Sequence, residues 1–205
     1  MSIIESLEKK IFEISYRNRL SHIGSCLTAL PIILEIYQTK EPEDKVIISC
    51  GHCHLAHAVV MEHFGFIESA EENVKKYGIH CEREGGCDCS TGSLGQGLPI
   101  ALGMALANRD RNVWCLISDG EMTEGSIYEA LHIKKKYEVD NLKVYCNYNG
   151  WGAYDRSEEY LPHILSGVKV CYTNNHWFIE KYQQEAHYKA LNQQEYEEII
   201  RNYFT

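Results

Sequence analysis

The sequence has no apolar run long enough to cross a bilayer, and it is poor in positive charge. Its 205 residues include 20 Lys and Arg against 29 Asp and Glu, which gives a formal net charge of −9. This acidity argues against nucleic acid or an anionic membrane as the main partner, because both are negatively charged. Residues 1–20 lack the apolar core of a signal peptide. We therefore expect a cytoplasmic protein.

The chain also lacks internal repeats, low-complexity tracts and any linker rich in proline or serine. Its length is that of one domain, and a hydrophobic content of 44% is enough for a sizeable core. We expect a single domain over residues 1–205.

Short and long apolar segments alternate along the chain. Unbroken short runs predict buried strands at 46–50, 113–118, 142–148 and 167–173. Longer segments predict helices at 1–20, 26–37, 54–65, 94–109, 127–137 and 192–204, with a polar break at 21–25 and a loop at 78–91. This alternation is typical of an α/β fold, a three-layer doubly wound parallel sheet with helices on both faces.

Two polar residues follow neighbouring predicted strands. Asp119 comes directly after the strand at 113–118, and Asn149 follows the strand at 142–148. Ligands of open parallel sheets bind at these carboxyl ends, and carboxylate and amide oxygens suit Mg²⁺ with a phosphate. Gly120 would let a diphosphate approach the backbone closely. The alternative is that Asp119 only caps the following helix, which is a common role of aspartate.

Residues 118–151, SDGEMTEGSIYEALHIKKKYEVDNLKVYCNYNGW, resemble the thiamine-diphosphate motif, a GDG turn followed at a set distance by Asn. The interval from Asp119 to Asn149 is that of the transketolase family, although Ser118 replaces the first glycine. Three more segments resemble this family in the same order: SHIGSCLTALPIILEIY, DKVIISCGHCHLAHAVVMEHFGF and STGSLGQGLPIALGMALANR. Together the resemblance covers about residues 10–155.

The resemblance implies thiamine diphosphate and Mg²⁺ (or Ca²⁺) as cofactors. It implies that Asp119, Asn149 and the carbonyl of Trp151 hold the metal, and that Glu124 lies at a subunit interface beside the cofactor. The cofactor-binding residues that it implies are His52, Gly92, Leu94, Gly95, Asp119, Gly120, Glu121, Glu124 and Asn149.

Four histidines are implied to be catalytic: His22, His52, His80 and His187. Imidazole can donate hydrogen bonds to substrate hydroxyls or move protons near neutral pH. The alternative for each of them is an ordinary surface or capping histidine, and for His187 an exposed structural one.

The second domain of the family, which binds the aminopyrimidine ring, has no counterpart in the sequence, and the pattern after about residue 155 is shortened. The resemblance therefore implies the N-terminal subunit of a split transketolase. With a C-terminal subunit, in a dimer of heterodimers, it would transfer a two-carbon ketol unit from a ketose (phosphate) to an aldose. The alternatives are a subunit of a 2-oxo acid decarboxylase or dehydrogenase, and a non-catalytic binding module.

Nine cysteines are unusual for a chain of this length. Cys50 and Cys53 flank His52, and Cys81, Cys87 and Cys89 follow His80, so a zinc site built from these residues is one hypothesis. The spacing matches a zinc motif poorly, and a cytoplasmic protein keeps its cysteines reduced. We therefore predict free thiols without zinc.

Overall fold

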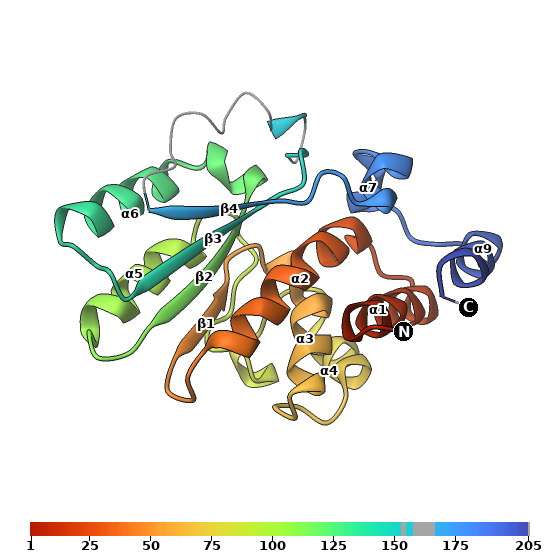
Figure 1. Cartoon of the computed structure of the whole chain (residues 1–205), viewed down its shortest axis with the longest axis horizontal. Coiled ribbons are helices and arrows are strands. Elements are labelled where there is room, and N and C mark those ends of the chain that lie inside the picture. The colour runs from red at the N-terminus through yellow and green to blue at the C-terminus, as the bar shows by residue number, and fades with distance from the viewer. Residues whose placement is uncertain (153–154, 158–166, 205) are drawn as a thin grey trace.

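The computed structural model describes residues 1–152, 155–157 and 167–204. Its centre is a parallel sheet in which the four strands lie in sequence order (Figure 1). These are β1 (Lys45–Ile48), β2 (Val113–Ser118), β3 (Leu142–Tyr148) and β4 (Val168–Tyr172). The bounds of β2 and β3 are those predicted from the sequence, and β1 and β4 differ from the predicted runs by one or two residues at their ends.

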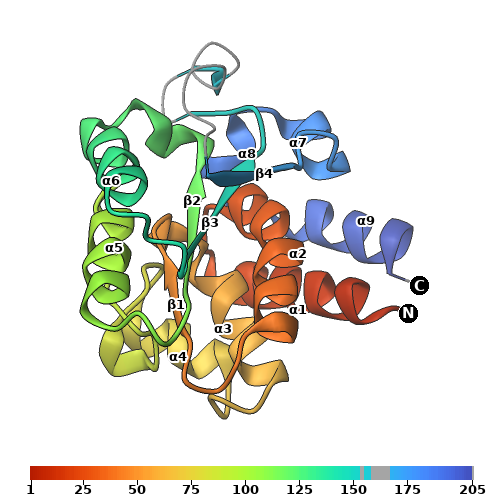
Figure 2. The same ribbon diagram turned by 60° about the vertical axis from the view of Figure 1, so that its left-hand side comes forward.

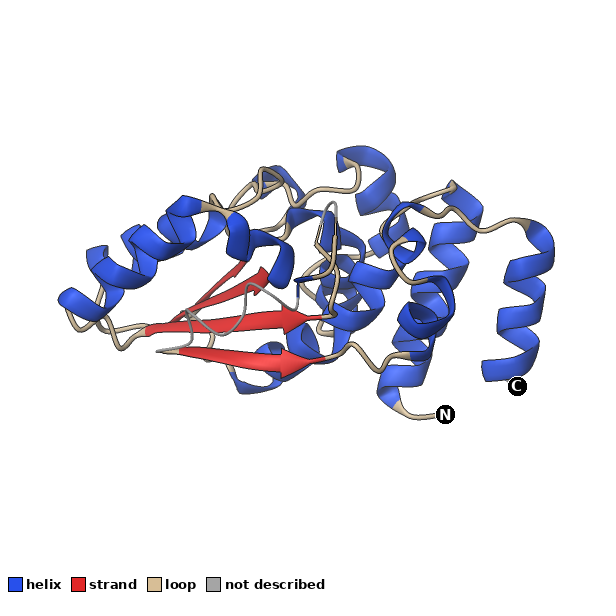
Figure 3. Cartoon of the chain, turned by 90° about the horizontal axis from the view of Figure 1, so that it is seen from above, coloured by secondary structure: helices blue, strands red, loops and turns tan. Residues whose placement is uncertain are grey.

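The helices surround this sheet (Figure 3). They are α1 (Ile3–Asn18), α2 (Ile23–Thr39), α3 (His54–His63), α4 (Ala70–Tyr77), α5 (Gly97–Ala107), α6 (Gly125–Lys136), α7 (Trp177–Tyr182), α8 (Glu185–Tyr188) and α9 (Gln193–Tyr203), with short 3-10 turns at Gly51–Cys53, Arg83–Gly85 and Asp119–Thr123. The prediction of a polar break over 21–25 was wrong beyond His22, because α2 begins at Ile23. The sequence pattern also missed α4, α7 and α8, which are too short or too polar for a periodic signal.

Successive strand residues point into two separate cores, one on each face of the sheet. On β2, Trp114 and Leu116 join the core under α1, α2 and α3, whereas Cys115 and Ile117 join the core under α5 and α6. Figure 2 shows α5 and α6 on one side of the sheet and α1, α2 and α3 on the other. The predicted parallel sheet with helices on both faces is therefore confirmed.

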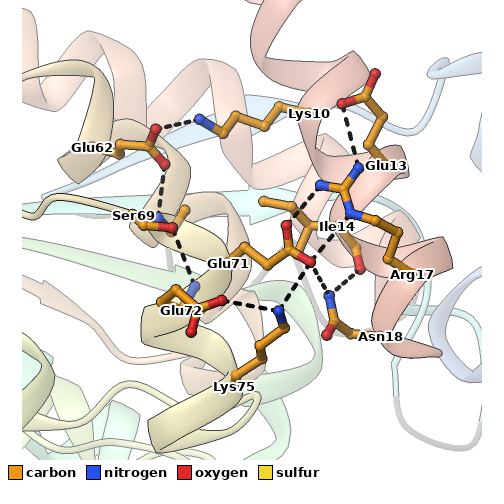
Figure 4. Close-up of polar contacts among 11 residues, drawn as sticks. Lys10, Glu13, Ile14, Arg17, Asn18, Glu62, Ser69, Glu71, Glu72 and Lys75 are labelled. Carbon is orange, nitrogen blue, oxygen red and sulfur yellow. Dashed lines mark hydrogen bonds and ion pairs between the residues drawn. The ribbon is translucent and has the colours of Figure 1, made fainter.

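A network of charged side chains ties α4 to α1 and α3 (Figure 4). Arg17 Nη2 donates to Glu71 Oε2 at 2.7 Å, and this hydrogen bond lowers the pKa of Glu71 to about 2. Lys10 pairs with Glu62, whose second oxygen accepts from the backbone N–H of Ala70 at 2.7 Å. The network fixes α4, a helix that carries little apolar surface of its own.

None of the helices in the described part of the chain is long and apolar enough to cross a membrane. The prediction that the region after about residue 155 is shortened concerns a stretch of which residues 158–166 lie outside the described residues.

Candidate active site

A pocket of about 210 Å³ opens at the carboxyl ends of β1, β2 and β3. It brings together ten of the thirteen residues that the sequence predicted for the site. These are His22, His52, His80, Gly92, Leu94, Asp119, Gly120, Asn149, Trp151 and His187. They come from six segments that span 166 positions of the sequence, from His22 to His187. These segments are brought together only by the folding of the chain.

Asp119 lies at the floor of this pocket, where β2 passes into the 3-10 turn Asp119–Thr123. Its Oδ2 accepts from the Ser157 hydroxyl at 2.6 Å and from the Gly150 N–H at 2.8 Å, and its Oδ1 accepts from the Gly120 N–H at 3.1 Å. Burial raises the pKa of Asp119 to about 6, against the opposing effect of these neutral donors. A bound cation would favour the charged carboxylate at this position.

Asn149 lies at the end of the neighbouring strand β3 and is 3% exposed. Its Oδ1 accepts from the backbone N–H of Trp151 at 3.0 Å, which forms a tight turn at the pocket. Gly150 within this turn has a φ of +88°, a backbone conformation that glycine adopts without a Cβ penalty. The Gly150 N–H of this turn donates to Asp119, and the next residue, Trp151, lines the pocket.

The donors fit a hard divalent cation bound to a diphosphate. The carboxylate of Asp119, the amide oxygen of Asn149 and the backbone at Trp151 are oxygen ligands of the kind that Mg²⁺ and Ca²⁺ take. The raised pKa of Asp119 fits as well, because in the described part of the chain its carboxylate accepts only from neutral groups, and a cation would supply the missing positive charge.

The first turn of α2 brings two histidines together. His22 has a φ of +62°, and its N–H donates to the carbonyl of His187 at 2.7 Å. A Cβ on Gly24 would lie 2.7 Å from the Ala186 Cβ, so α8 approaches α2 this closely because residue 24 is glycine. This contact carries His187 into the pocket, where it is 8% exposed, so the alternative of an exposed structural histidine was wrong.

Burial and mutual repulsion hold these imidazoles neutral. Desolvation lowers the pKa of His52 to about 3, with smaller contributions from His22, His187 and His80. Desolvation, with His22, lowers the pKa of His187 to about 4, and desolvation, with His80, lowers that of His22. At neutral pH His22, His52 and His187 therefore present uncharged rings, each able to donate one hydrogen bond and accept another.

His80 enters the pocket on the loop between α4 and α5. Gly92 belongs to the same loop, and a Cβ there would lie 3.1 Å from the His80 ring. A Cβ on Gly51 would lie 2.4 Å from the Thr91 carbonyl oxygen, so the 3-10 turn after β1 supports this loop directly. Both glycines are therefore needed for the close packing of the loop.

Glu121, Gly95 and Glu124, which the sequence also predicted for the site, are not among the residues that line the pocket. The fully buried carboxylate of Glu121 accepts from Ser49 Oγ at 2.5 Å, from Gly95 N at 2.9 Å and from Ser118 N at 2.9 Å. Burial raises its pKa. Glu121 thus joins the ends of β1 and β2 to the loop before α5.

Some residues of the site were not predicted from the sequence. Ser25 and Tyr188 line the pocket, and Ser25 Oγ lies 2.6 Å from His187 Nδ1. Ser157 lies behind the pocket and donates to Asp119. Ser25 falls within the segment SHIGS that carries His22, so that segment held a signal for it, whereas nothing in the sequence around Ser157 singles it out.

Comparison with known proteins identifies the family of this chain. Residues 2–202 match the family described as 1-deoxy-D-xylulose-5-phosphate synthase. The A-subunit of apulose-4-phosphate transketolase from Phocaeicola vulgatus is 30% identical over 219 residues, which cover 97% of this chain and 74% of the relative. The chain belongs to the transketolase family.

Other transketolases share part of the chain. Human transketolase is 32% identical over 155 residues, which cover 65% of this chain and 25% of the human protein. Two solved transketolase structures share its fold. The one from Campylobacter jejuni is 24% identical, with a TM-score of 0.60, and the match covers 76% of this chain and 30% of that one. The one from Leishmania mexicana is 21% identical, with a TM-score of 0.60, and the match covers 75% of this chain and 28% of that one.

The chain thus spans about three-quarters of the Phocaeicola vulgatus relative and about a quarter of the human transketolase. It corresponds to the N-terminal part of a transketolase-type enzyme, and the family to which it belongs depends on thiamine diphosphate.

Proposed function

We propose that this chain is the diphosphate-binding subunit of a two-chain transketolase that moves a two-carbon ketol unit from a ketose (phosphate) to an aldose. The observation that carries the proposal is the joint lining of one pocket by Asp119, Asn149 and the neutral imidazoles of His22, His52 and His187. The name of the relative from Phocaeicola vulgatus makes it one subunit of its enzyme, which supports a second chain. The assembly that we propose is a dimer of such heterodimers.

In this proposal Asp119, Asn149 and the Trp151 carbonyl would hold Mg²⁺ (or Ca²⁺), which would neutralise the charge of the cofactor's diphosphate. Gly120 allows the diphosphate to approach the backbone, and Gly92 and Leu94 line the cofactor site. When bound, thiamine diphosphate supplies the nucleophilic carbon that takes up the ketol unit.

The histidines of the chain orient the sugar and move its protons. With Nδ1–H of His187 donating to Ser25 Oγ, the buried Nε2 of His187 has no partner among the described residues and can accept a hydrogen bond from a sugar hydroxyl. His22 and His52, whose ring centroids lie 5.1 Å apart, can donate to neighbouring hydroxyl oxygens of the same substrate. This supply of donors suits a polyhydroxylated sugar better than a 2-oxo acid.

The substrate class is tested with the assembled enzyme. We expect ketol transfer from a ketose phosphate to an aldose acceptor, measured as release of the shortened aldose and formation of the lengthened ketose. A 2-oxo acid without an aldose serves as the second substrate, with carbon dioxide release as the measurement. Carbon dioxide release without ketol transfer would make the chain part of a decarboxylase instead.

His22 and His52 should act on the substrate and contribute little to folding. We expect His22→Asn, which tolerates the positive φ of this position, and His52→Ala to lower kcat of the assembled enzyme on the order of 10²-fold. Their melting temperatures should stay close to that of the unchanged protein.

The exposed His63, at the end of α3, provides the matched control, and His63→Asn should leave kcat unchanged. Normal kcat together with a large loss of stability in the His22 and His52 variants would show that both rings are structural.

A further inference from the structure

Outside the pocket, metal-ligating side chains of α3 lie against two cysteines of the loop that follows α4. His54 and His57 lie one turn apart on α3, and Cys81 and Cys87 come from the loop. A nitrogen of His54 and the sulfurs of Cys81 and Cys87 all lie within 4.8 Å of one another, and all three residues are buried. The Nδ1 of His57 lies 3.8 Å from Cys81 Sγ and 3.6 Å from Cys87 Sγ.

In both histidines the Nε2 atom forms a hydrogen bond with another side chain, which fixes the orientation of the ring. The Nε2 of His54 lies 2.9 Å from Asn73 Oδ1, and the Nε2 of His57 lies 2.7 Å from the Tyr37 hydroxyl. The Nδ1 of His54 is buried and has no hydrogen-bond partner in the described part of the chain. An unpartnered buried polar atom costs free energy unless something binds it, and here it belongs to a ring that lies against two sulfurs.

We propose that His54, His57, Cys81 and Cys87 form a structural zinc site. Zinc in such sites is tetrahedral, with bonds of about 2.3 Å to sulfur and about 2.1 Å to nitrogen, which places the N and S ligands roughly 3.6 Å apart. The distances from His57 Nδ1 to the two sulfurs already have this value within a few tenths of an ångström. All four ligands come from the protein, so the site is closed and offers no position for a substrate.

The outer contacts of the two histidines also suit a metal. Metal-bound histidines donate their other ring N–H to a fixed acceptor, which orients the ring and leaves the free nitrogen for the metal. The Asn73 oxygen and the Tyr37 oxygen are in place for this role. Asn73 itself is held on the other side, because its Nδ2 donates to the carbonyl of Gly85 at 2.8 Å.

This proposal reverses the sequence-based prediction of free thiols without zinc, and its ligands differ from the ones that the sequence suggested. Cys50 and Cys53 donate instead to the carbonyls of Leu116 and Ser25, and His80 lines the active-site pocket. All nine cysteines are free thiols in the structure. The ligands that meet are therefore two histidines that the sequence did not single out and only two of the five candidate cysteines.

The zinc would fix the loop that carries His80 and Gly92. Cys81 directly follows His80, and its carbonyl accepts from the Thr91 N–H at 3.0 Å. On the α3 side, His54 comes two residues after His52 and directly follows the 3-10 turn Gly51–Cys53. A metal that joins α3 to this loop would thus help to position two of the pocket histidines, His52 and His80, although its ligands do not line the pocket. The zinc proposal therefore does not depend on which reaction the pocket catalyses.

The test is metal analysis of the full chain, expressed with zinc in the medium and purified without chelator or metal-affinity tag. We expect about one zinc per chain, and for the cobalt-substituted protein the visible absorption bands of a tetrahedral thiolate site. The double variant Cys81→Ser/Cys87→Ser should lose the zinc. The matched control, Cys89→Ser/Cys171→Ser, removes two partly buried thiols outside the cluster and should keep it.

A measurement on the unchanged protein covers the case in which the double variant does not fold. A zinc chelator should lower its Tm by roughly 10 °C, and zinc but not Mg²⁺ should restore it. Zinc-free protein, zinc retained by a folded Cys81→Ser/Cys87→Ser variant, or a Cys81–Cys87 disulfide in protein purified under reducing conditions would each overturn the proposal.

Discussion

The variant Asp119→Ala should abolish the cofactor-dependent activity of the assembled enzyme while the protein still folds. We expect a loss of kcat/KM on the order of 10³-fold or more, because the metal that carries the diphosphate loses its charged ligand. The fold should persist because β2 and β3 are held by two apolar cores that do not include Asp119.

A second variant, Asp119→Asn, separates the loss of the metal ligand from the loss of the hydrogen bonds that Asp119 accepts. Removal of its carboxylate leaves the Ser157 hydroxyl and the Gly150 N–H without their acceptor, and this costs about 1–3 kcal/mol per buried group. Asp119→Asn keeps one oxygen in place and should restore most of this stability, but a neutral amide is a poor substitute for the charged ligand. Activity should therefore stay low in both variants, whereas Tm should fall mainly in Asp119→Ala.

Asp44 offers the matched control. It is a buried aspartate just before β1, at the opposite end of the strands, where its Oδ2 accepts from Trp114 Nε1 at 2.8 Å. Asp44→Asn should cost stability and leave activity per folded molecule unchanged. Full activity of the Asp119 variants at saturating Mg²⁺ and thiamine diphosphate would refute the metal assignment.

The positions of Asp119 and Asn149 could be predicted from the sequence because they depend on strand ends alone. The runs 113–118 and 142–148 are buried strands in the structure with the predicted bounds, so the ends of β2 and β3 were clear. Parallel neighbours then place both residues at one edge of the sheet. The histidines came instead from the family resemblance, since no periodicity marks a pocket histidine.

Contacts between distant segments could not be predicted in this way. His187 reaches the pocket because Gly24 lets α8 approach α2, a packing contact between residues 24 and 186. The family resemblance implies that Glu121 binds the cofactor, yet the S-x-x-E pattern from Ser118 to Glu121 also predicts a capping box, which the structure shows. His57 lies 24 and 30 positions from the two cysteines that it contacts, too far for a local spacing rule.

The chain alone should have no transketolase activity and should gain it on mixing with a C-terminal subunit. The family resemblance implies that a carboxyl group of the missing second domain, held against the pyrimidine ring, activates thiamine diphosphate, and a positioned acid–base group contributes on the order of 10³-fold. Within the described part of this chain, the one carboxylate that lines the pocket is Asp119, which we assign to the metal. Glu121 is buried behind the pocket and accepts three hydrogen bonds already.

The outward face of α5 is our candidate for part of the partner contact. Leu98, Ala101 and Leu102 pack against the sheet, whereas Ile100 and Leu106 are 38% and 40% exposed on the other side of the helix. Apolar side chains at such a position are expected at an interface that closes the cofactor cleft against water.

Ketol transfer is measured for each purified chain and for the mixture, and light scattering gives the mass of each species. We expect the mixture to exceed either chain by on the order of 10³-fold and to form a larger complex. Ile100→Glu should weaken this activation without lowering Tm, because the side chain contributes little to the core of the free chain. The matched control is Ile3→Glu, an exposed isoleucine at the start of α1 on the opposite side of the sheet. If this chain alone matched the mixture, it would have to supply the activating carboxyl group itself, and the two-chain proposal would fail.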